Sequence, residues 1–306
     1  MTNSITVTVP ATTANLGPGF DCLGAALTLY NQFKFSRLQP DAQKAVEITI
    51  TGTEAQQVLT NSNNLAYQAF AKLYQHLGQL PPPIQIEIQL GVPLARGLGS
   101  SATAIVGGLL GANLLAGSPL TQTEVMQMAI AIEGHPDNVV PALLGGCCLA
   151  ASGKTNWQIC DIPWHRDVVA IVAIPNFELS TQQARSVLPP HYTRADAIFN
   201  IAHLGLLIRG LETGKAEWLH TALQDRIHQP YRQALIPGYD AVHAAALAAG
   251  AYGMVISGAG PTLLALGAVT AAEVIATAIT AAWAKHEVTA QVQPLQVDFQ
   301  GARQVT

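Results

Sequence analysis

Charged residues are scarce in this sequence, because Lys, Arg, Asp and Glu together account for only 11% of its 306 residues. The formal net charge is −4, and no dense cluster of Lys and Arg occurs, so the electrostatic footprint of a nucleic-acid-binding protein is missing. We therefore expect a small-molecule partner and no nucleic acid. A hydrophobic content of 49% excludes a disordered or fibrous chain and is enough for two globular domains.

Cysteine is also rare, with four residues at positions 22, 147, 148 and 160. Two of them are adjacent, and this spacing suits neither a disulfide framework nor the paired ligands of a zinc site. We expect all four to be buried thiols in a reducing compartment.

Long hydrophobic runs are missing as well. The run at 104–116 is shorter than the roughly 20 residues that a membrane span needs, and the Ala-rich stretch 263–283 is interrupted by Glu273. The first ten residues, MTNSITVTVP, have neither a basic head nor a long apolar core, which favours a first β-strand over a signal peptide. The sequence therefore predicts a soluble, cytoplasmic protein with no membrane partner.

The patterns that are present predict a mixture of strands and helices. Alternation of apolar and polar residues predicts half-buried strands at 5–9, 46–51 and 84–89. Fully apolar or mixed runs predict further strands at 168–174, around GMVISG and LLALG, and at 287–298. Helices are predicted at 64–77, 100–116, 121–132, 181–188, 194–212, 238–249 and 270–285. Strands and helices mixed without strict βαβ alternation indicate an α+β protein of two layers, with a domain boundary near residue 163.

The segment PLARGLGSSAT, residues 93–103, is a glycine-rich turn that runs into a helix. Backbone N–H groups and a helix amino terminus can hold a phosphate without the lysine of a P-loop. Gly97 and Gly99 would let the backbone come close to the phosphate, while Ser100 and Ser101 could donate to its oxygens or bind Mg²⁺. For an isolated loop, an ordinary turn followed by a serine-capped helix explains the pattern equally well.

A second polar cluster lies in VTVPATTANLGPGFDCLGAAL, residues 7–27, where a strand runs into a loop that holds Asn15 and Asp21. Asn15 could form an ordinary Asx-turn. Asp21 stands between Phe20 and Cys22, so it needs a cationic or hydrogen-bonding partner if it is buried.

A third cluster, AIEGHPDNVVPALLGG at 131–146, carries Glu133, His135, Asp137 and Asn138 at a predicted helix end. Glu133 could complete a hard-cation site with a serine hydroxyl and nucleotide phosphates. Alternatively, Asp137 or Asn138 could cap the short helix that follows. A fourth segment, SGAGPT at 257–262, lies between two predicted strands and suits a tight turn or a binding loop equally.

Together these four segments resemble the signature motifs of the GHMP kinases, the family of galacto-, homoserine, mevalonate and phosphomevalonate kinases. The resemblance covers nearly the whole chain. The forms NLGPGFD and EGHPDN are similar to the branch that phosphorylates the side-chain hydroxyl of L-homoserine with ATP during threonine biosynthesis. The resemblance implies a ribosomal-protein-S5-domain-2-like domain over 1–163, a ferredoxin-like domain over 164–306, an active site between them and a homodimer.

The resemblance also implies roles for individual residues. ATP would be held by Asn64 and by the glycine-loop residues Pro93, Leu94, Ala95, Arg96, Gly97, Leu98, Gly99, Ser100, Ser101, Ala102 and Thr103. Ser101 and Glu133 would bind Mg²⁺. The acceptor would be held by Asn15, Asp21, His135, Asn138, Thr181, Arg185 and Arg232. Two arginines suit a carboxylate because each guanidinium offers paired donors. Taken alone, Arg185 would suit a solvated helix face and Arg232 a surface ion pair.

Catalysis is expected to involve Asn138, Glu133 and Ser101. An amide cannot take the proton of the acceptor hydroxyl, so catalysis would rest on alignment and charge neutralisation, and the proton would leave late, to the transferred phosphate. Asp137 is the rival base, although consecutive helical residues point in different directions and we favour Asn138. Two other functions stay open: a GHMP kinase for a different small alcohol, and a catalytically silent ligand-binding regulator on the same fold.

Overall fold

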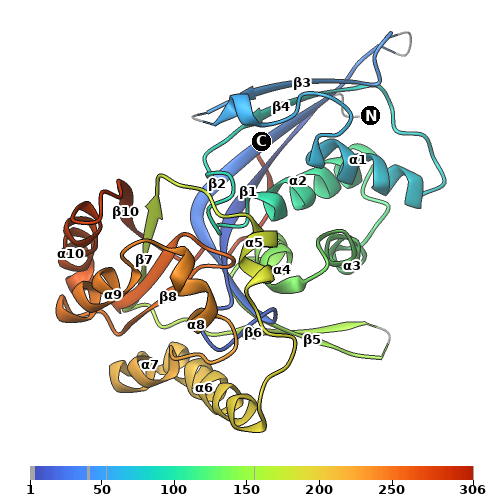
Figure 1. The fold of residues 1–306 in the computed structure, drawn as a ribbon. Helices are drawn as coiled ribbons and strands as arrows, with labels where there is room; N and C mark the ends of the chain where they lie inside the picture. Colours follow the sequence, from blue (N-terminus) through green and yellow to red (C-terminus); the bar gives the residue numbers. More distant parts are fainter. Residues whose placement is uncertain (1–3, 40–41, 53, 155, 306) are drawn as a thin grey trace.

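The computed structural model describes residues 4–39, 42–52, 54–154 and 156–305, and its strands form two separate sheets (Figure 1). The strands of the first sheet are β1 (Ser4–Ala14), β2 (Leu23–Arg37), β3 (Val46–Thr51), β4 (Ile84–Gln89), β5 (Cys147–Ser152), β6 (Trp157–Ile162) and β11 (Arg303–Val305). Their order is β11-β1-β2-β4-β3, and the β5–β6 hairpin is attached to β2. Only the β3–β4 pair is parallel among the described strand pairs of this sheet.

The central strand β2 is 15 residues long and was not predicted from the sequence. Its first five residues, Leu23–Leu27, are buried without interruption, so the alternation that reveals a half-buried strand is missing there. Residues Gln32–Arg37 pair with β4, whereas Leu23–Ala25 pair with β5. A register shift between Pro10 and Ala11 of β1 accompanies this change of partner.

Helices cover one face of the first sheet (Figure 1). They are α1 (Leu65–His76), α2 (Ser100–Leu115), α3 (Gln122–Glu133) and α4 (Pro136–Leu144), with a short 3₁₀ turn, η1 (Ala55–Gln57), before α1. The core beneath them contains Phe33 and Phe35 of β2 together with Phe70 of α1. The predicted helices at 64–77, 100–116 and 121–132 are confirmed, as is the capping box of Thr121 and Glu124.

The second sheet has the order β10-β7-β9-β8, with all neighbours antiparallel. Its strands are β7 (Val168–Pro175), β8 (Gly253–Ile256), β9 (Leu263–Ala268) and β10 (Ala290–Leu295), and α9 (Tyr239–Ala248) and α10 (Ala272–Ala284) cover one face. This order, with helices before the second and fourth strands, is the ferredoxin-like arrangement that the sequence predicted. Residues of β7 alternate between the core under α9 and α10 and a core shared with the first sheet, which explains the uninterrupted burial of this strand.

Four helices lie between β7 and α9 in the chain: α5 (Thr181–Ser186), α6 (Arg194–Thr213), α7 (Ala216–Ala222) and α8 (Gln229–Arg232). The 3₁₀ turns η2 (Gln233–Leu235) and η3 (Val269–Ala271) follow α8 and β9. The sequence predicted α5 and α6 but neither α7, of seven residues, nor α8, of four. Leu207, Leu211 and Leu219 of α6 and α7 join the core between the sheets.

The chain enters the second sheet and returns from it beside β2. Ile162 pairs with Cys147, which in turn pairs with Ala25. On the return, Asp298 donates its N–H to the carbonyl of Ala26, after which β11 joins the first sheet beside β1. The predicted α+β class in two layers is confirmed, whereas the domain division at residue 163 stays a prediction.

The four cysteines are free thiols, and their burial differs from the prediction. Cys147 and Cys148 are buried as expected, but Cys22 is partly exposed and Cys160 is exposed. Cys160 lies on β6 opposite Leu149 of β5, where β6 has one described partner strand and its side chains alternate toward solvent. Within the described part of the chain, no helix combines the length and apolar character needed to cross a membrane.

Candidate active site

A cavity of about 500 Å³ lies where the two layers meet. It is bounded by the β1–β2 loop, residues 95–101, residues 133–138, residues 179–185, Arg232 and residues 258–260. These segments include all four motifs that the sequence singled out. The structure therefore gathers into one space residues that are more than 200 positions apart in the chain.

The glycine loop is held from behind through its carbonyl groups. Four consecutive carbonyl oxygens accept hydrogen bonds from other segments: Ala95 from Leu179 N (3.2 Å), Arg96 from Thr262 N (3.2 Å), Gly97 from Ser257 Oγ (2.7 Å) and Leu98 from Thr12 N (3.0 Å). The helix α2 begins directly after the loop, and its first residues, Ser100 and Ser101, line the cavity. The first N–H groups of a helix have no acceptor within the helix, so this end can receive an anion.

Gly97 and Gly99 are required by the packing of the loop. Both have positive φ, 76° and 67°. A Cβ atom on Gly97 would lie 2.3 Å from the carbonyl oxygen of Ser257, and one on Gly99 would lie 1.9 Å from Oγ1 of Thr12. The glycines therefore allow the loop to dock against the SGAGPT turn and against β1, a reason that the sequence alone did not reveal.

Arg96 anchors the loop to the second layer. Its side chain is almost fully buried, and it donates from Nε to the carbonyl of Pro175 and from Nη1 to that of Leu94. It also forms ion pairs with Glu54 and Glu178, each at 3.3 Å. The guanidinium is thus engaged with protein groups on several sides.

The other residues predicted to bind ATP lie in three different places. Asn64 and Leu94 line a second cavity of about 250 Å³, whose wall also includes Phe33, Leu65 and Leu90 and which shares Ser100 and Ser101 with the first cavity. Asn64 caps α1, because its Oδ1 accepts from the N–H groups of Ala66 and Tyr67. In contrast, Leu98, Ala102 and Thr103 are buried behind the loop, and Pro93 faces a separate surface hollow.

Ser101 and Glu133, the predicted metal ligands, are in contact. Ser101 Oγ donates to Glu133 Oε1 at 2.8 Å, joining the first turn of α2 to the last residue of α3. A hydroxyl and a carboxylate are the hard oxygen donors that Mg²⁺ prefers, so this pair fits that ion. A second group of potential metal ligands, Asp21, His135 and Asp137, has ligand atoms within 4.8 Å of one another.

Asp21 has a cationic partner, although its side chain is 34% exposed and not buried. Arg185 of α5 donates from Nη2 to Oδ1 at 2.7 Å and from Nη1 to Oδ2 at 3.0 Å, which is a bidentate pair. The hydrogen bonds with Asp21 raise the pKa of Arg185. The alternative of a solvated helix face for Arg185 is therefore wrong.

Arg232 is buried, so the alternative of a surface ion pair is wrong for this residue. Only 2% of it is exposed, and its Nε and Nη1 donate to the carbonyls of Ala184 and Gly258, both at 3.0 Å. Burial, reinforced by the charge of Arg185, lowers the pKa of Arg232 to about 10, so the side chain stays charged at neutral pH. No carboxylate of the described residues forms an ion pair with this guanidinium.

His135 and Asp137 form a pair at the start of α4. The N-cap of this helix is His135, so the alternative in which Asp137 or Asn138 provides the cap is wrong. His135 Nδ1 lies 2.6 Å from Asp137 Oδ1, and this hydrogen bond raises the pKa of His135. Both Asp137 and Asn138 belong to the lining of the cavity.

Thr12 orients Asn138 and was not predicted as a site residue. Its Oγ1 donates to Asn138 Oδ1 at 2.8 Å, which leaves the amide Nδ2 of Asn138 as a donor for the cavity. Thr12 and Asn138 are 126 positions apart, so no local spacing could reveal the contact. Thr181, predicted on the acceptor side, also lines the cavity, next to the capping Ser180.

Two family models match the chain, GHMP kinases N terminal domain over residues 64–146 and GHMP kinases C terminal over residues 207–285. The chain is 68% identical to the homoserine kinase of Microchaete diplosiphon, over 98% of this chain and 97% of that protein. It is 66% identical to the homoserine kinase of Trichormus variabilis, over 98% of each. The crystal structure of homoserine kinase from Cytophaga hutchinsonii has a TM-score of 0.90 at 31% identity and covers 100% of this chain and 98% of that one.

Proposed function

The chain belongs to the GHMP kinase family, and on this premise we propose that it transfers the γ-phosphoryl group of ATP to the side-chain hydroxyl of L-homoserine. The product is O-phospho-L-homoserine, an intermediate of threonine biosynthesis. The observation that carries this proposal is that one cavity combines groups suited to phosphates with charged side chains suited to an amino acid. A loop and helix end suited to phosphates face a buried cation, Arg232, and a paired carboxylate, Asp21, which suit the two charged groups of an amino acid.

ATP occupies the two adjoining cavities in this proposal. The adenine lies in the smaller, largely apolar cavity beside Asn64, and the phosphates extend past Ser100 and Ser101 into the larger one. The loop is suited to this task because its carbonyls are already engaged by other segments, so its position does not depend on the ligand.

Mg²⁺ is part of the proposal, with Ser101 and Glu133 as its ligands from the protein. When bound, the ion would neutralise charge on the phosphate oxygens. Glu133→Gln should therefore raise the Mg²⁺ concentration that gives half-maximal ADP release and lower turnover by about a hundredfold. Glu124→Gln, on the same helix, is the matched control, because Glu124 is exposed and serves only the capping box. Equal Mg²⁺ requirements for the two variants would contradict this assignment.

The acceptor is held by side chains from both layers. Arg232 receives its carboxylate, since this cation forms no ion pair with a carboxylate of the described residues, and Arg185 supports the same end while it pairs with Asp21. Asp21, His135 and Thr181 bind the amino group and the backbone of the substrate. Asn15, which donates to the carbonyl of Gly258, closes the floor of this pocket.

Phosphoryl transfer follows from alignment and charge neutralisation. Asn138 is fixed by Thr12 with its amide N–H group toward the cavity, so it can position the acceptor oxygen but cannot remove the proton. Asp137 is the rival base, but its Oδ1 is already engaged in the hydrogen bond with His135. The hydroxyl attacks phosphorus, the bond to the leaving ADP oxygen breaks, and the proton passes to an oxygen of the transferred phosphate.

The test is ADP release from Mg-ATP in parallel with L-homoserine, L-serine, L-threonine, mevalonate and galactose. We expect turnover with L-homoserine to exceed that with each of the other alcohols. Faster turnover with mevalonate or galactose would identify a different GHMP kinase. ADP release with none of them would identify a catalytically silent regulator.

The proposed reaction takes place in the cytoplasm, where ATP is available and cysteines stay reduced. A homodimer, the absence of a nucleic-acid partner and the absence of a membrane partner stay predictions. Light scattering coupled to size-exclusion chromatography measures the first of these directly.

A further inference from the structure

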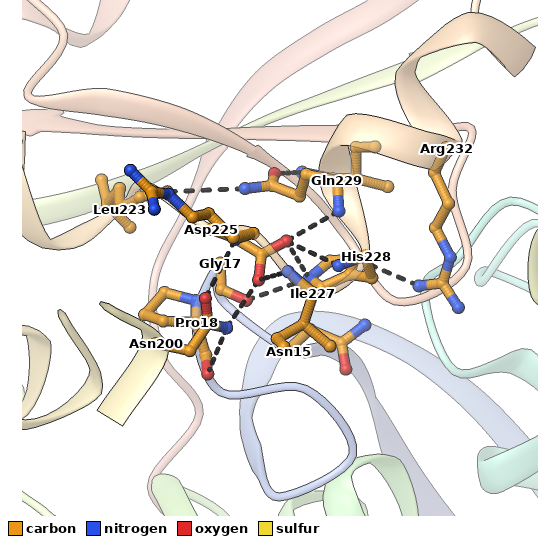
Figure 2. A network of polar contacts seen from close by, with 12 residues as sticks. Asn15, Gly17, Pro18, Asn200, Leu223, Asp225, Ile227, His228, Gln229 and Arg232 are labelled. Atoms are coloured by element: carbon orange, nitrogen blue, oxygen red, sulfur yellow. Dashed lines mark hydrogen bonds and ion pairs between the residues drawn. The ribbon is translucent and has the colours of Figure 1, made fainter. Parts of the chain in front are cut away.

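A buried polar network lies beneath the acceptor side of the cavity (Figure 2). It is organised by Asp225, whose side chain is fully buried. Its carboxylate accepts four hydrogen bonds, from Asn200 Nδ2 (2.7 Å) and from the N–H groups of Ile227 (2.9 Å), His228 (2.9 Å) and Gln229 (2.7 Å). Four donors satisfy an ionised carboxylate, so Asp225 fixes the turn that leads into α8 and has no need of a ligand.

His228, in that turn, connects two segments of the cavity wall. Its ring nitrogen Nε2 lies 2.9 Å from the carbonyl oxygen of Gly17, and Nδ1 lies 3.3 Å from Nη1 of Arg232 (Figure 2). A carbonyl oxygen can only accept and a guanidinium can only donate. The hydrogen must therefore be on Nε2 and the lone pair on Nδ1, which is the neutral imidazole.

The surroundings of His228 also favour the neutral ring. The side chain is 0% exposed, and burial is the main cause that lowers the pKa of His228. The charge of Arg232 lowers it further, while Asp225, the Gly17 carbonyl and the more distant Asp21 act in the opposite direction.

The network ends on two residues that the proposed function assigns to the acceptor. Arg232 Nη1 and Asn15 Nδ2 donate to the same carbonyl, that of Gly258, at 3.0 and 2.9 Å. Phe20 packs against both His228, with ring centroids 5.1 Å apart, and the guanidinium of Arg232, 5.2 Å from its ring. The remaining guanidinium nitrogen, Nη2, has no hydrogen-bond partner among the described residues, so it is the donor left for a ligand.

We infer that His228 is a positioning residue for the acceptor: it accepts from Arg232 and donates to Gly17, and so holds the guanidinium and the β1–β2 loop in the arrangement that binds a carboxylate. An arginine side chain has many rotamers, and a guanidinium that is already fixed loses less entropy when the ligand binds. Asp225 acts through His228, because it fixes the turn that carries the ring. This inference rests on the proposed function, which supplies the carboxylate.

Two substitutions separate the two hydrogen bonds of His228. His228→Asn can keep an acceptor near the position of Nδ1, whereas His228→Gln can keep a donor near the position of Nε2 and loses the acceptor for Arg232. We expect His228→Gln to raise the KM for L-homoserine about tenfold, with unchanged KM for ATP, because a hydrogen bond to a charged group is lost. His228→Asn should raise it less. The matched control is His243→Asn, a half-buried histidine of α9 outside the cavity, which should leave both KM values unchanged.

A double substitution tests whether His228 acts through Arg232. In the Arg232→Lys background, His228→Gln should raise the KM for L-homoserine no further. If His228 had only a structural role, the effects of His228→Gln and Arg232→Lys on the KM for L-homoserine would multiply. The KM values for ATP and L-homoserine would also rise equally, and Gln and Asn at position 228 would have equal effects. Any of these results would overturn the inference. Absence of L-homoserine-dependent ADP release by the wild-type protein would overturn both the inference and the proposed function.

The tautomer can be measured without depending on the folding of the Gln variant. The ¹⁵N shifts of the ring nitrogens in histidine-labelled wild-type protein, assigned with the His228→Asn spectrum, should show hydrogen on Nε2 only. A ring protonated on Nδ1, or on both nitrogens at neutral pH, could not accept from Arg232 and would refute the inference.

Discussion

Two walls of the cavity can be compared: the proposed nucleotide wall, formed by residues 95–101, and the proposed acceptor wall, formed by Asn15, Asp21, Arg185 and Arg232. The nucleotide wall presents main-chain groups and serine hydroxyls from one continuous stretch. The acceptor wall presents charged and amide side chains from three separate segments of the chain: the β1–β2 loop, α5 and α8. The first wall is therefore specified by the path of the backbone, and the second by contacts between distant side chains.

The two walls consequently depend on different kinds of support. The nucleotide wall is held by hydrogen bonds to its carbonyls and by glycines that permit close docking. The acceptor wall is held by charge pairing at Asp21 and Arg185 and by the buried network that fixes Arg232. Substitutions that change the backbone conformation should therefore weaken the binding of ATP. Substitutions that change charge or hydrogen bonding should weaken the binding of the acceptor.

The largest effect is expected where the two substrates would meet. Asn138→Ala removes the amide that we propose to position the acceptor oxygen, so kcat should fall by about a hundredfold while the KM for ATP stays unchanged. Thr12→Val, which frees the same amide without removing it, should lower kcat less. Steady-state ADP release measures both, and near-wild-type turnover of Asn138→Ala would refute its catalytic role.

A charge change on the acceptor wall should come next. Arg232→Lys loses the fork that binds a carboxylate and should raise the KM for L-homoserine by about thirtyfold or more, with little change for ATP. Arg185→Lys should have a smaller effect, because Asp21 already neutralises that side chain. Arg209→Lys, on the exposed face of α6, is the control. A larger effect from Arg185 than from Arg232 would reverse the assignment of the carboxylate anchor.

A backbone change on the nucleotide wall should raise the KM for ATP more than the KM for L-homoserine. Gly99→Ala introduces a Cβ into the contact with Thr12 at positive φ, so the KM for ATP should rise about tenfold and that for L-homoserine should change less. Gly117→Ala is the matched control at the other end of α2, since Gly117 also has positive φ but has open space around it. If both variants changed the KM for ATP equally, backbone strain alone would be the cause.

The smallest effect concerns stability and pH. The pKa of His135 is raised above its ordinary value of about 6.5 by its hydrogen bond with Asp137, so the folded state binds this proton more tightly than the unfolded state. The resulting stabilisation is present in full below pH of about 6.5 and is lost as the pH rises through the raised pKa. The difference in unfolding free energy between wild type and His135→Gln should therefore shrink as the pH rises through the raised pKa. Urea unfolding across this range would show it, and a constant difference would contradict it.

The same comparison explains how much the sequence could predict. The nucleotide wall was recognisable because its residues are contiguous and because glycine and serine at a helix start have a local physical meaning. Most helices were predicted for a similar reason, because the helical spacing of their apolar residues can be recognised within a few turns of sequence. The long strand β2 was missed because burial on both faces removes its alternation.

The acceptor wall could be predicted only through the resemblance to a family. The sequence indicated that Asp21 needs a partner if it is buried. Arg185 lies 164 positions away, however, and no local sequence pattern connects the two residues. Thr12, Asp225 and His228 escaped detection altogether. His228 does stand four residues before Arg232, the spacing that places side chains on one side of a helix, and this weak signal could have drawn attention to the pair.

The path of the chain between the two sheets has a mechanical consequence. The outgoing connection leaves from Ile162 and the returning one arrives at Asp298, and both are tied to the short stretch of β2 around Ala25 and Ala26, directly or through Cys147. The two layers are joined at other places as well, because Arg96 bonds to Pro175, Asp21 pairs with Arg185 and the two sheets share one core. The connections therefore add covalent attachment to a contact that already holds the glycine loop against the residue before the N-cap of α5.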